Sequence, residues 1–356
     1  MAEKLKIALI GCGFFGSQLA SAFHKAGADL LAVMDINPTF AQNLAAQYDC
    51  RAFLNTEEML SSVKPDLAII ATPNYAHYSP AILALNAGCH LFIDTPFTLS
   101  AAHCQHLEQL AKEKGKQIFV GHLLRTLPGI LKVKEALEQG KLGKITVTRA
   151  MRQRWIDNVP NKEWWKLDAN LTGGELFHQI HELDLLCWLL GDIDAVYAQS
   201  ANRAHGDTPD SKDVIQLLLR FHNGVLGSLE MGTAYRLHQW GIQLHGEKGA
   251  IEINFFTSTV TFSYIDGTTE HIDLYAEFEA DLSLRESAKG TQQYNATHTL
   301  CPLWLSRAAE IEAESIVAHF TQVRISPLAV CLSKAIQVAE AARYSTIVEK
   351  QISLTD

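Results

Sequence analysis

Residues 5–20 read LKIALIGCGFFGSQLA, and this stretch decides how the rest of the chain is interpreted. An apolar run leads into a G-x-G-x-x-G turn, and a segment of helical periodicity follows. In such a unit Gly11 permits the tight turn, Gly13 lets the backbone approach a pyrophosphate, and Gly16 lets the helix pack closely on the strand. The start of the helix offers unpaired amides and a positive dipole end to an anion. The turn residues expected to contact a dinucleotide are Gly11, Cys12, Gly13, Phe14, Phe15 and Gly16.

Two other interpretations of this stretch are open at first. Lysines before the apolar run resemble the start of a secretory signal, and Cys12 resembles a lipid-attachment site, but both require an apolar core that glycines do not divide. Asp35 favours the dinucleotide, because it ends a second predicted strand where a carboxylate accepts hydrogen bonds from the adenosine ribose. Its charge would repel a ribose phosphate, so we expect NAD rather than NADP. A solvated aspartate at a strand end is the alternative.

Composition restricts the class of protein. The chain has 356 residues, 47% of them hydrophobic and 19% charged, which is enough for two domains with their own cores. A net charge of -9 argues against a nucleic-acid or anionic-membrane partner. No apolar stretch approaches the roughly 20 residues of a membrane span. Seven scattered cysteines with no C-x-x-C pair fit a reducing compartment, so we expect a soluble cytoplasmic protein.

The first third of the chain alternates apolar runs with segments of helical period. This pattern predicts a doubly wound parallel sheet with helices on both faces. Two of the strands end in polar sequences, Thr72-Pro73-Asn74 and Asp94-Thr95-Pro96, and the carboxyl edge of such a sheet is where ligands bind. The expected strands are 5–10, 30–34, 51–53, 67–71, 90–93 and 117–120.

The pattern changes after a helix expected at about 128–139. Runs with period-two alternation or β-branched residues follow one another with few helices between them, which predicts a largely antiparallel sheet in a second domain of α+β type. One helix is expected over 175–190 and others over 308–320 and 327–347, whereas 276–306 shows no assignable pattern. The expected strands are 144–154, 195–201, 214–221, 225–231, 241–246 and 250–253.

Residues 172–184, TGGELFHQIHELD, place polar side chains inside an apolar helical segment. On one continuous helix His178, His181 and Asp184 would share a face. A histidine held by a neighbour can accept an alcohol proton near neutral pH as a hydride leaves, and we expect His181 in that role with Asp184 orienting it. The histidines could instead be satisfied polar groups at a domain junction. A metal site is not expected, because zinc helices favour i, i+4 spacing.

A second group of side chains suits a small polar substrate. Arg152 and Arg154 share one strand face, and Trp164, Trp165 and Lys166 follow. Aromatic planes with charged donors can hold a sugar ring and its hydroxyl or carboxylate groups. A surface strand with a tryptophan-capped loop is the alternative. The expected substrate contacts are Arg125, Arg152, Trp164, Lys166, His178 and His181, of which Arg125 and Lys166 are preferred.

In combination, these motifs resemble the Gfo/Idh/MocA family, named for glucose-fructose oxidoreductase and inositol dehydrogenase. The resemblance runs from the glycine turn through the Thr72-Pro73-Asn74 and Gly121-His122 motifs to 342–345. It implies an N-terminal Rossmann domain over 1–121, and a C-terminal α/β domain over 122–356 whose open sheet joins a homodimer or homotetramer. It also implies a nicotinamide facing a sugar or polyol between them. The cofactor contacts that it implies beyond the turn and Asp35 are Ala71, Thr72, Pro73, Asn74, His77, Asp94, Thr95 and His122.

The sequence departs from the family pattern at two positions. The acid-Lys-Pro motif reads Asp94-Thr95-Pro96, so the lysine that the family places beside the nicotinamide is missing. Thr95 can form hydrogen bonds there, but it cannot act as a base near neutral pH. Phe177 stands where family members often carry an aspartate four residues before the catalytic histidine. These changes shift the acid/base role onto His181, with His178 and His122 as further candidates.

The leading interpretation is an NAD-dependent oxidoreductase that transfers hydride between nicotinamide and a secondary hydroxyl of a sugar, polyol or derivative. Two alternatives stay open. One is a glycoside hydrolase that uses bound NAD for a transient oxidation and elimination. The other is an NAD-binding regulator without turnover.

Overall fold

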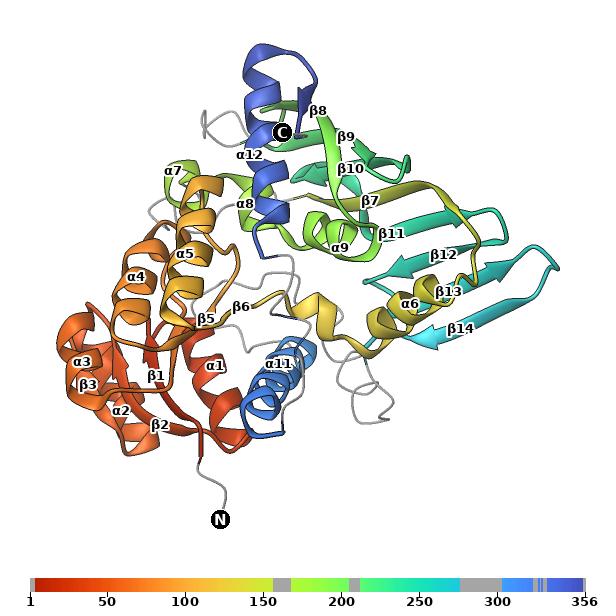
Figure 1. The fold of residues 1–356 in the computed structure, drawn as a ribbon. Helices are drawn as coiled ribbons and strands as arrows, with labels where there is room; N and C mark the ends of the chain where they lie inside the picture. Colours follow the sequence, from red (N-terminus) through yellow and green to blue (C-terminus); the bar gives the residue numbers. More distant parts are fainter. Residues whose placement is uncertain are drawn as a thin grey trace. The chain divides into compact units, whose positions relative to one another are not determined.

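The computed structural model describes residues 4–155, 168–204, 212–275, 303–322, 326, 328 and 332–354. The chain divides into two compact units (Figure 1): unit 1 is Met1–Leu123 with Leu300–Ser333, and unit 2 is Leu124–Thr299 with Lys334–Asp356. From the sequence we expect a single division, at residue 121. The sequence gives no sign that 300–333 belongs to unit 1. None of the described helices combines the length and apolar character that crossing a membrane requires.

Unit 1 is built on a parallel sheet of six strands in the order β3-β2-β1-β4-β5-β6. Its central strands are buried on both faces, with Ile7, Leu9 and Ile69 fully shielded from solvent, as expected where helices cover both sides. The order reverses between β1 and β4, and ligands bind at the carboxyl edge beside such a reversal. The strands are β1 Lys6–Ile10, β2 Asp29–Met34, β3 Arg51–Phe53, β4 Leu67–Ile70, β5 His90–Ile93 and β6 Ile118–Val120.

Two helices of unit 1 begin at side-chain caps that the sequence contains. The Asn37 side chain accepts from the Thr39 amide with Pro38 at the first helical position, and the Asn55 side chain accepts from the Glu58 amide. The helices are α1 Phe14–Lys25, α2 Pro38–Tyr48, α3 Thr56–Val63, η1 Asn74–Ala76, α4 Tyr78–Asn86, α5 Ala101–Lys114 and α11 Leu303–Gln322.

The last of these helices, α11, explains why unit 1 needs a distant segment. It lies against α1 (Figure 1) and places Ala309, Ala313 and Ile316 in the same apolar cluster as Phe23 and Phe92. Burial of that apolar face favours its association with unit 1 over any position that exposes it. The sequence showed the helix but not its partner, because helical period does not specify which core a helix joins.

Unit 2 contains a sheet of nine strands in the order β14-β13-β12-β11-β7-β10-β9-β8-β15. Every neighbouring pair is antiparallel except β7 and β10, which confirms the largely antiparallel sheet. β13 and β14 were not among the expected strands. The strands are β7 Ile145–Trp155, β8 Ile193–Ala201, β9 Val214–Phe221, β10 Leu226–Gly232, β11 Ala234–Gly246, β12 Gly249–Asn254, β13 Thr259–Tyr264, β14 Thr269–Asp273 and β15 Ile352–Ser353.

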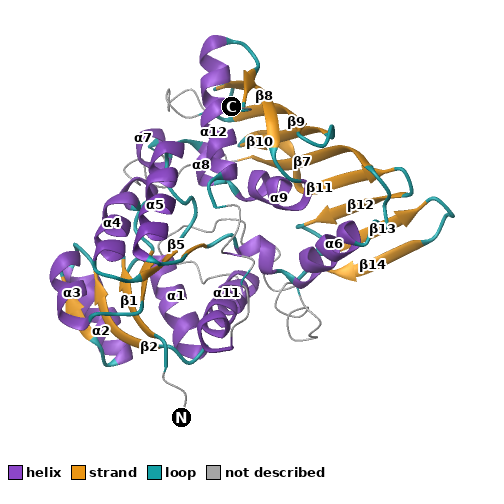
Figure 2. Ribbon diagram, in the orientation of Figure 1, coloured by secondary structure: helices purple, strands orange, loops and turns teal. Residues whose placement is uncertain are grey.

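Helices accompany this sheet (Figure 2), and one of them corrects the sequence interpretation. The continuous helix expected over 175–190 is wrong: α8 ends at His178, Gln179 leaves helical geometry with φ -113° and ψ 44°, and α9 begins at His181. Hydrophobic period continues across the break, so it gave no sign of one. The bounds are η2 Leu123–Thr126, α6 Pro128–Glu138, α7 Ala169–Thr172, α8 Glu175–His178, α9 His181–Leu190 and α12 Lys334–Val348.

Candidate active site

The glycine turn of unit 1 fits a dinucleotide. Gly11 has φ +99°, and a Cβ there would lie 2.5 Å from the Ala71 carbonyl oxygen, so only glycine is accommodated. A Cβ at Gly16 would collide with the Gly11 carbonyl oxygen. In contrast, among the described residues no atom beyond Gly13 and its chain neighbours lies within 4 Å of a Cβ placed at Gly13. Two glycines are thus required by packing, while the third leaves open surface where a pyrophosphate can approach the backbone.

Asp35 is fixed beside this turn. Its Oδ2 accepts from the Cys12 amide at 2.7 Å, and its Oδ1 accepts from the Asn37 amide at 2.8 Å. Each oxygen keeps a second lone pair, so both can still accept from ribose hydroxyls. Burial, and next the Asp35 charge, raises the pKa of the Cys12 thiol to about 12, which makes Cys12 an unreactive packing residue.

The residues that follow β4 and β5 meet at one edge of the sheet, as the sequence predicts. The buried His77 ring connects the two loops: Nδ1 lies 2.8 Å from the Pro96 carbonyl oxygen and Nε2 lies 2.9 Å from that of Thr72. The Thr95 amide donates to Asp94 Oδ1 at 2.7 Å. His77 therefore holds the loops together rather than offering a free nitrogen to a ligand. The other expected cofactor residues at this edge are Ala71, Pro73, Asn74 and, after β6, the buried His122.

Glu312 of α11 is a residue that sequence reasoning missed. Its side chain is fully buried, and neither carboxyl oxygen has a hydrogen-bond partner in the part of the chain that the structure describes. Burial, and then the nearby Asp94 charge, raises the pKa of Glu312 well above its ordinary value, so the fold favours the protonated form of the group. The signal was present in the sequence as one acidic residue on the face of α11 that carries Ala309 and Ile316.

In unit 2, Arg125 and Asp184 form a buried two-point ion pair. Arg125 Nε donates to Asp184 Oδ2 at 2.8 Å, and Arg125 Nη2 donates to Oδ1. Their side chains are 0% and 2% exposed. Arg–carboxylate pairs of this kind fix orientation strongly. The arrangement favours a positioning role for Arg125 over the expected contact with substrate.

His181, at the start of α9, is the expected acid/base residue. Its Nδ1 is buried and has no hydrogen-bond partner among the described residues, so Asp184 does not hold it in the expected way. Burial, and next Arg152, lowers the pKa of His181 to about 4, while Asp184 opposes this shift. The imidazole is therefore neutral near pH 7 and can accept a proton. His178, which ends α8, is half-buried, and the break at Gln179 separates it from the face of α9.

Arg152 is held in a polar and aromatic cluster. Its Nη1 donates to Glu182 Oε1 at 2.7 Å, and Trp240 Nε1 donates to the same oxygen. The guanidinium carbon lies 4.5 Å from the centre of the Trp240 ring. The neighbouring Arg154 donates to Glu175 Oε1 at 3.0 Å. Both arginines thus already have a carboxylate partner, which reduces their value as receptors for a substrate carboxylate.

Trp164 and Lys166, the remaining expected substrate contacts, lie outside the described residues. Within the described part of the chain, no group of three or more His, Cys, Asp or Glu side chains could hold a metal ion.

Comparison with known proteins gives two family matches. A model described as an oxidoreductase family with an NAD-binding Rossmann fold, GFO/IDH/MocA, matches residues 5–122, and the model of the GFO/IDH/MocA C-terminal domain matches residues 130–252. The chain is 30% identical to the 2,7-anhydro-N-acetylneuraminate hydratase of Escherichia coli, over 87% of this chain and 84% of that protein. It is 27% identical to the protein of the same name from Mediterraneibacter gnavus, over 98% of this chain and 96% of that protein.

A solved structure shows the same fold. Levoglucosan dehydrogenase in complex with NADH and levoglucosan superposes with a TM-score of 0.82 at 20% identity, covering 99% of this chain and 100% of that one.

Proposed function

The chain belongs to the Gfo/Idh/MocA family of oxidoreductases, and on this premise we propose that it uses NAD to oxidise or reduce a secondary hydroxyl of a sugar, polyol or derivative. The observation that supports the cofactor most directly is Asp35, held by the Cys12 amide beside the open backbone at Gly13. Bound NAD would supply the hydride acceptor or donor. Ribose recognition would fall to Asp35, and the pyrophosphate would lie on the glycine turn.

His181 is proposed as the base that accepts the proton of the substrate hydroxyl. Because its pKa is about 4, the imidazole is deprotonated over the whole neutral range and can accept the hydroxyl proton as the hydride leaves. Asp184 lies close enough to favour the imidazolium that forms, although its carboxylate is shared with Arg125. Thr95 would act only through hydrogen bonds. In this proposal unit 1 binds the dinucleotide and unit 2 supplies the base.

A panel of sugars and polyols tests this function. Purified protein is incubated with NAD and each compound, and NADH absorbance and the sugar product are followed together. Net NADH formation with a polyol or sugar supports the dehydrogenase. Binding of NADH with no turnover of any compound would favour the regulator.

A second function is favoured by one comparison: the two hydratases match this chain over 98% and 87% of its length. Transient oxidation of a sugar carbon acidifies the neighbouring C–H bond, so a C–O bond can be eliminated and water added before the carbon is reduced again. The sugar gains one water, and the cofactor ends unchanged. Cleavage of an anhydro or aryl glycoside bond with catalytic NAD and no accumulation of NADH would identify this reaction and contradict simple dehydrogenation.

The cofactor preference is tested at Asp35. Two unit charges 4 Å apart interact by about 4 kcal/mol at an effective dielectric of 20. A third of that energy is close to the ~1.4 kcal/mol that corresponds to a tenfold preference. Asp35→Ala is therefore expected to reduce the preference for NADH over NADPH about tenfold or more, measured as Kd by fluorescence titration. Asp29→Ala, at the exposed opposite end of β2, is the matched control. A preference unchanged by Asp35→Ala would remove this residue from the ribose site.

We also propose that unit 2 forms a homodimer or homotetramer through its open sheet. Leu218, Leu226 and Val147 are 62%, 59% and 44% exposed on the face opposite the buried Leu217, Leu219 and Leu229. Leu226 and Val147 are direct neighbours across β10 and β7. Exposed apolar side chains gathered on one sheet face are typical of a surface that a partner covers.

A further inference from the structure

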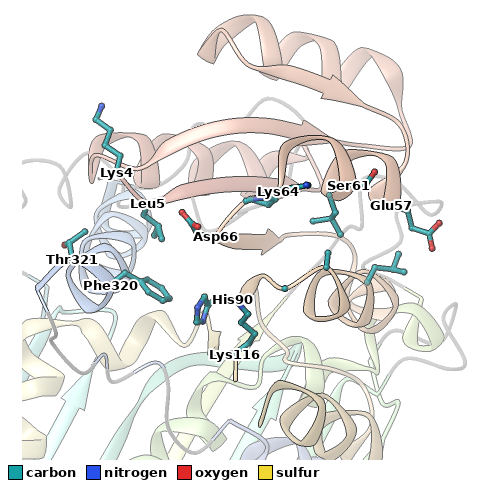
Figure 3. Close-up of a pocket in the computed structure, with 15 residues that line it drawn as sticks. Lys4, Leu5, Glu57, Ser61, Lys64, Asp66, His90, Lys116, Phe320 and Thr321 are labelled. Atoms are coloured by element: carbon teal, nitrogen blue, oxygen red, sulfur yellow. The ribbon is translucent and has the colours of Figure 1, made fainter. Parts of the chain in front are cut away.

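Unit 1 has a pocket at the amino edge of its sheet, at the opposite ends of the strands from the glycine turn (Figure 3). The pocket has a volume of about 750 Å³ and is lined by the starts of β1, β4 and β5 and the ends of α3, α4 and α11. Sites for small molecules usually have volumes of about 300–1,000 Å³. This pocket is therefore large enough for a metabolite, and the proposed function does not use it.

Charged side chains make up much of the polar wall of the pocket (Figure 3): three lysines and the two carboxylates Asp66 and Glu57. Lys4, Lys64 and Lys116 line it, and none of them forms an ion pair within the described residues. Each ammonium group carries three donors and no acceptor. Lys25, elsewhere in unit 1, does find a carboxylate, Glu310, at 2.6 Å. The lining therefore carries three lysines against two carboxylates, and the lysine ammonium groups have no ion-pair partner among the described residues.

His90 adds a neutral donor of fixed direction. Its Nδ1 accepts from the Gln117 amide at 3.0 Å, and burial, followed by the Lys116 charge, lowers the pKa of His90 to about 4. The neutral ring must then carry its proton on Nε2. The Phe320 ring packs edge-on against His90 with centroids 4.7 Å apart, which holds the imidazole in place. Figure 3 shows His90 and Lys116 next to each other at the pocket.

Two carboxylates, Asp66 and Glu57, also line the pocket, and Asp66 is held in place by a hydrogen bond. Asp66 Oδ2 accepts from the Lys6 amide at 2.9 Å, which orients the carboxylate at the pocket edge of β4. A carboxylate next to cations suits a ligand that carries hydroxyl groups as well as an anion, because hydroxyls can donate to it. Leu5 and Leu83 supply apolar surface for carbon atoms.

We propose that this pocket binds a phosphorylated sugar or polyol, with the phosphate held by Lys116, Lys64 and the His90 Nε2–H group and a hydroxyl donating to Asp66. A phosphate is preferred to a carboxylate because it presents three acceptor oxygens and close to two charges, which match several donors at once. The proposal does not rest on the redox function, since the pocket and the glycine turn lie at opposite ends of the strands.

Binding is tested by calorimetric titration of the full chain with glucose 6-phosphate, inorganic phosphate and glucose. NADH is present at saturation so that the glycine turn cannot bind the phosphate. Glucose 6-phosphate is expected to bind with one site per chain and more tightly than inorganic phosphate, and glucose is expected not to bind. Higher salt should weaken the binding, because ionic screening acts on the partly exposed lysines.

Variants locate the site. Lys116→Gln and Lys64→Gln are each expected to weaken glucose 6-phosphate binding about tenfold. Lys112→Gln, which removes the same charge from an exposed position of α5 outside the pocket, is expected to change it less than twofold. Circular dichroism and thermal unfolding confirm that each variant is folded.

Three results would overturn the proposal. The first is no binding of glucose 6-phosphate, and the second is an equal effect of Lys112→Gln and Lys116→Gln, which would indicate an adventitious ion only. The third is equal affinity for inorganic phosphate and glucose 6-phosphate, which would remove the sugar from the site.

Discussion

Replacing His181 with asparagine is expected to lower kcat by a factor of about 100 to 10,000, the usual contribution of a positioned general base. NADH affinity should change less than twofold, because His181 belongs to unit 2 and the dinucleotide contacts to unit 1. Stopped-flow measurement of hydride transfer and fluorescence titration of NADH separate the two quantities. His245→Asn, at an exposed position of β11, is the matched control and should leave both unchanged.

The pH profile adds a second measurement of the same residue. Because burial and Arg152 lower the pKa of His181 to about 4, the reactive neutral imidazole persists as pH falls from 8 toward 5. The contribution of His181 to kcat/KM should therefore stay constant over that range and decrease only as pH approaches 4. Full activity of His181→Asn would mean that the histidine takes no part in the chemistry and is structural.

Replacing Glu312 with glutamine is expected to stabilise the protein at neutral pH. The folded state favours the protonated form of Glu312 because burial and Asp94 raise its pKa, whereas the unfolded chain ionises the group above its ordinary value of 4.5. Unfolding of the wild type thus releases a proton, and stability falls by about 1.4 kcal/mol for each pH unit from 4.5 up to the raised pKa. Glutamine has a similar shape and no proton to release. The stability of Glu312→Gln therefore does not fall with pH for this reason.

The measurement is urea unfolding from pH 5 to pH 8. The stability of Glu312→Gln relative to the wild type should increase as the pH rises above 5. Glu314→Gln is the control, since that carboxylate lies two residues away, is 54% exposed and pairs with Arg307. Its difference from the wild type should depend little on pH. A constant difference for Glu312→Gln would show that Glu312 is ionised in the folded protein.

The sequence predicted the parallel sheet and its glycine turn for a physical reason. The signals are local: a strand, a turn that requires Gly11 and Gly16, and a carboxylate at the end of the next strand. Because parallel strands bring their carboxyl ends to one edge, the position of Thr72 and Asp94 follows from the order of the elements. The backbone conformation at Gly11, the close packing at Gly16 and the parallel direction of the strands were sufficient to predict this edge of the sheet.

The other half depends on contacts that no local pattern contains. Arg125 and Asp184 pair across 59 residues of sequence, and Arg152 reaches Glu182 across 30. These pairings occupy groups that the sequence offered to a substrate. The break at Gln179 likewise removes the shared face expected for His178 and His181. Charge and period identified candidate residues, but only tertiary contacts show which of them are already engaged.

The return of α11 to unit 1 has a consequence for synthesis of the chain. Residues up to Leu123 leave the ribosome long before Leu303 does. Phe23, Phe92 and Phe119 therefore stay uncovered until the apolar face of α11 has been synthesised. During translation the core of unit 1 is therefore incomplete and part of its apolar surface is exposed to solvent. Nascent chains in this condition aggregate or bind chaperones. A stop codon anywhere in the stretch that encodes unit 2 would make that transient exposure permanent.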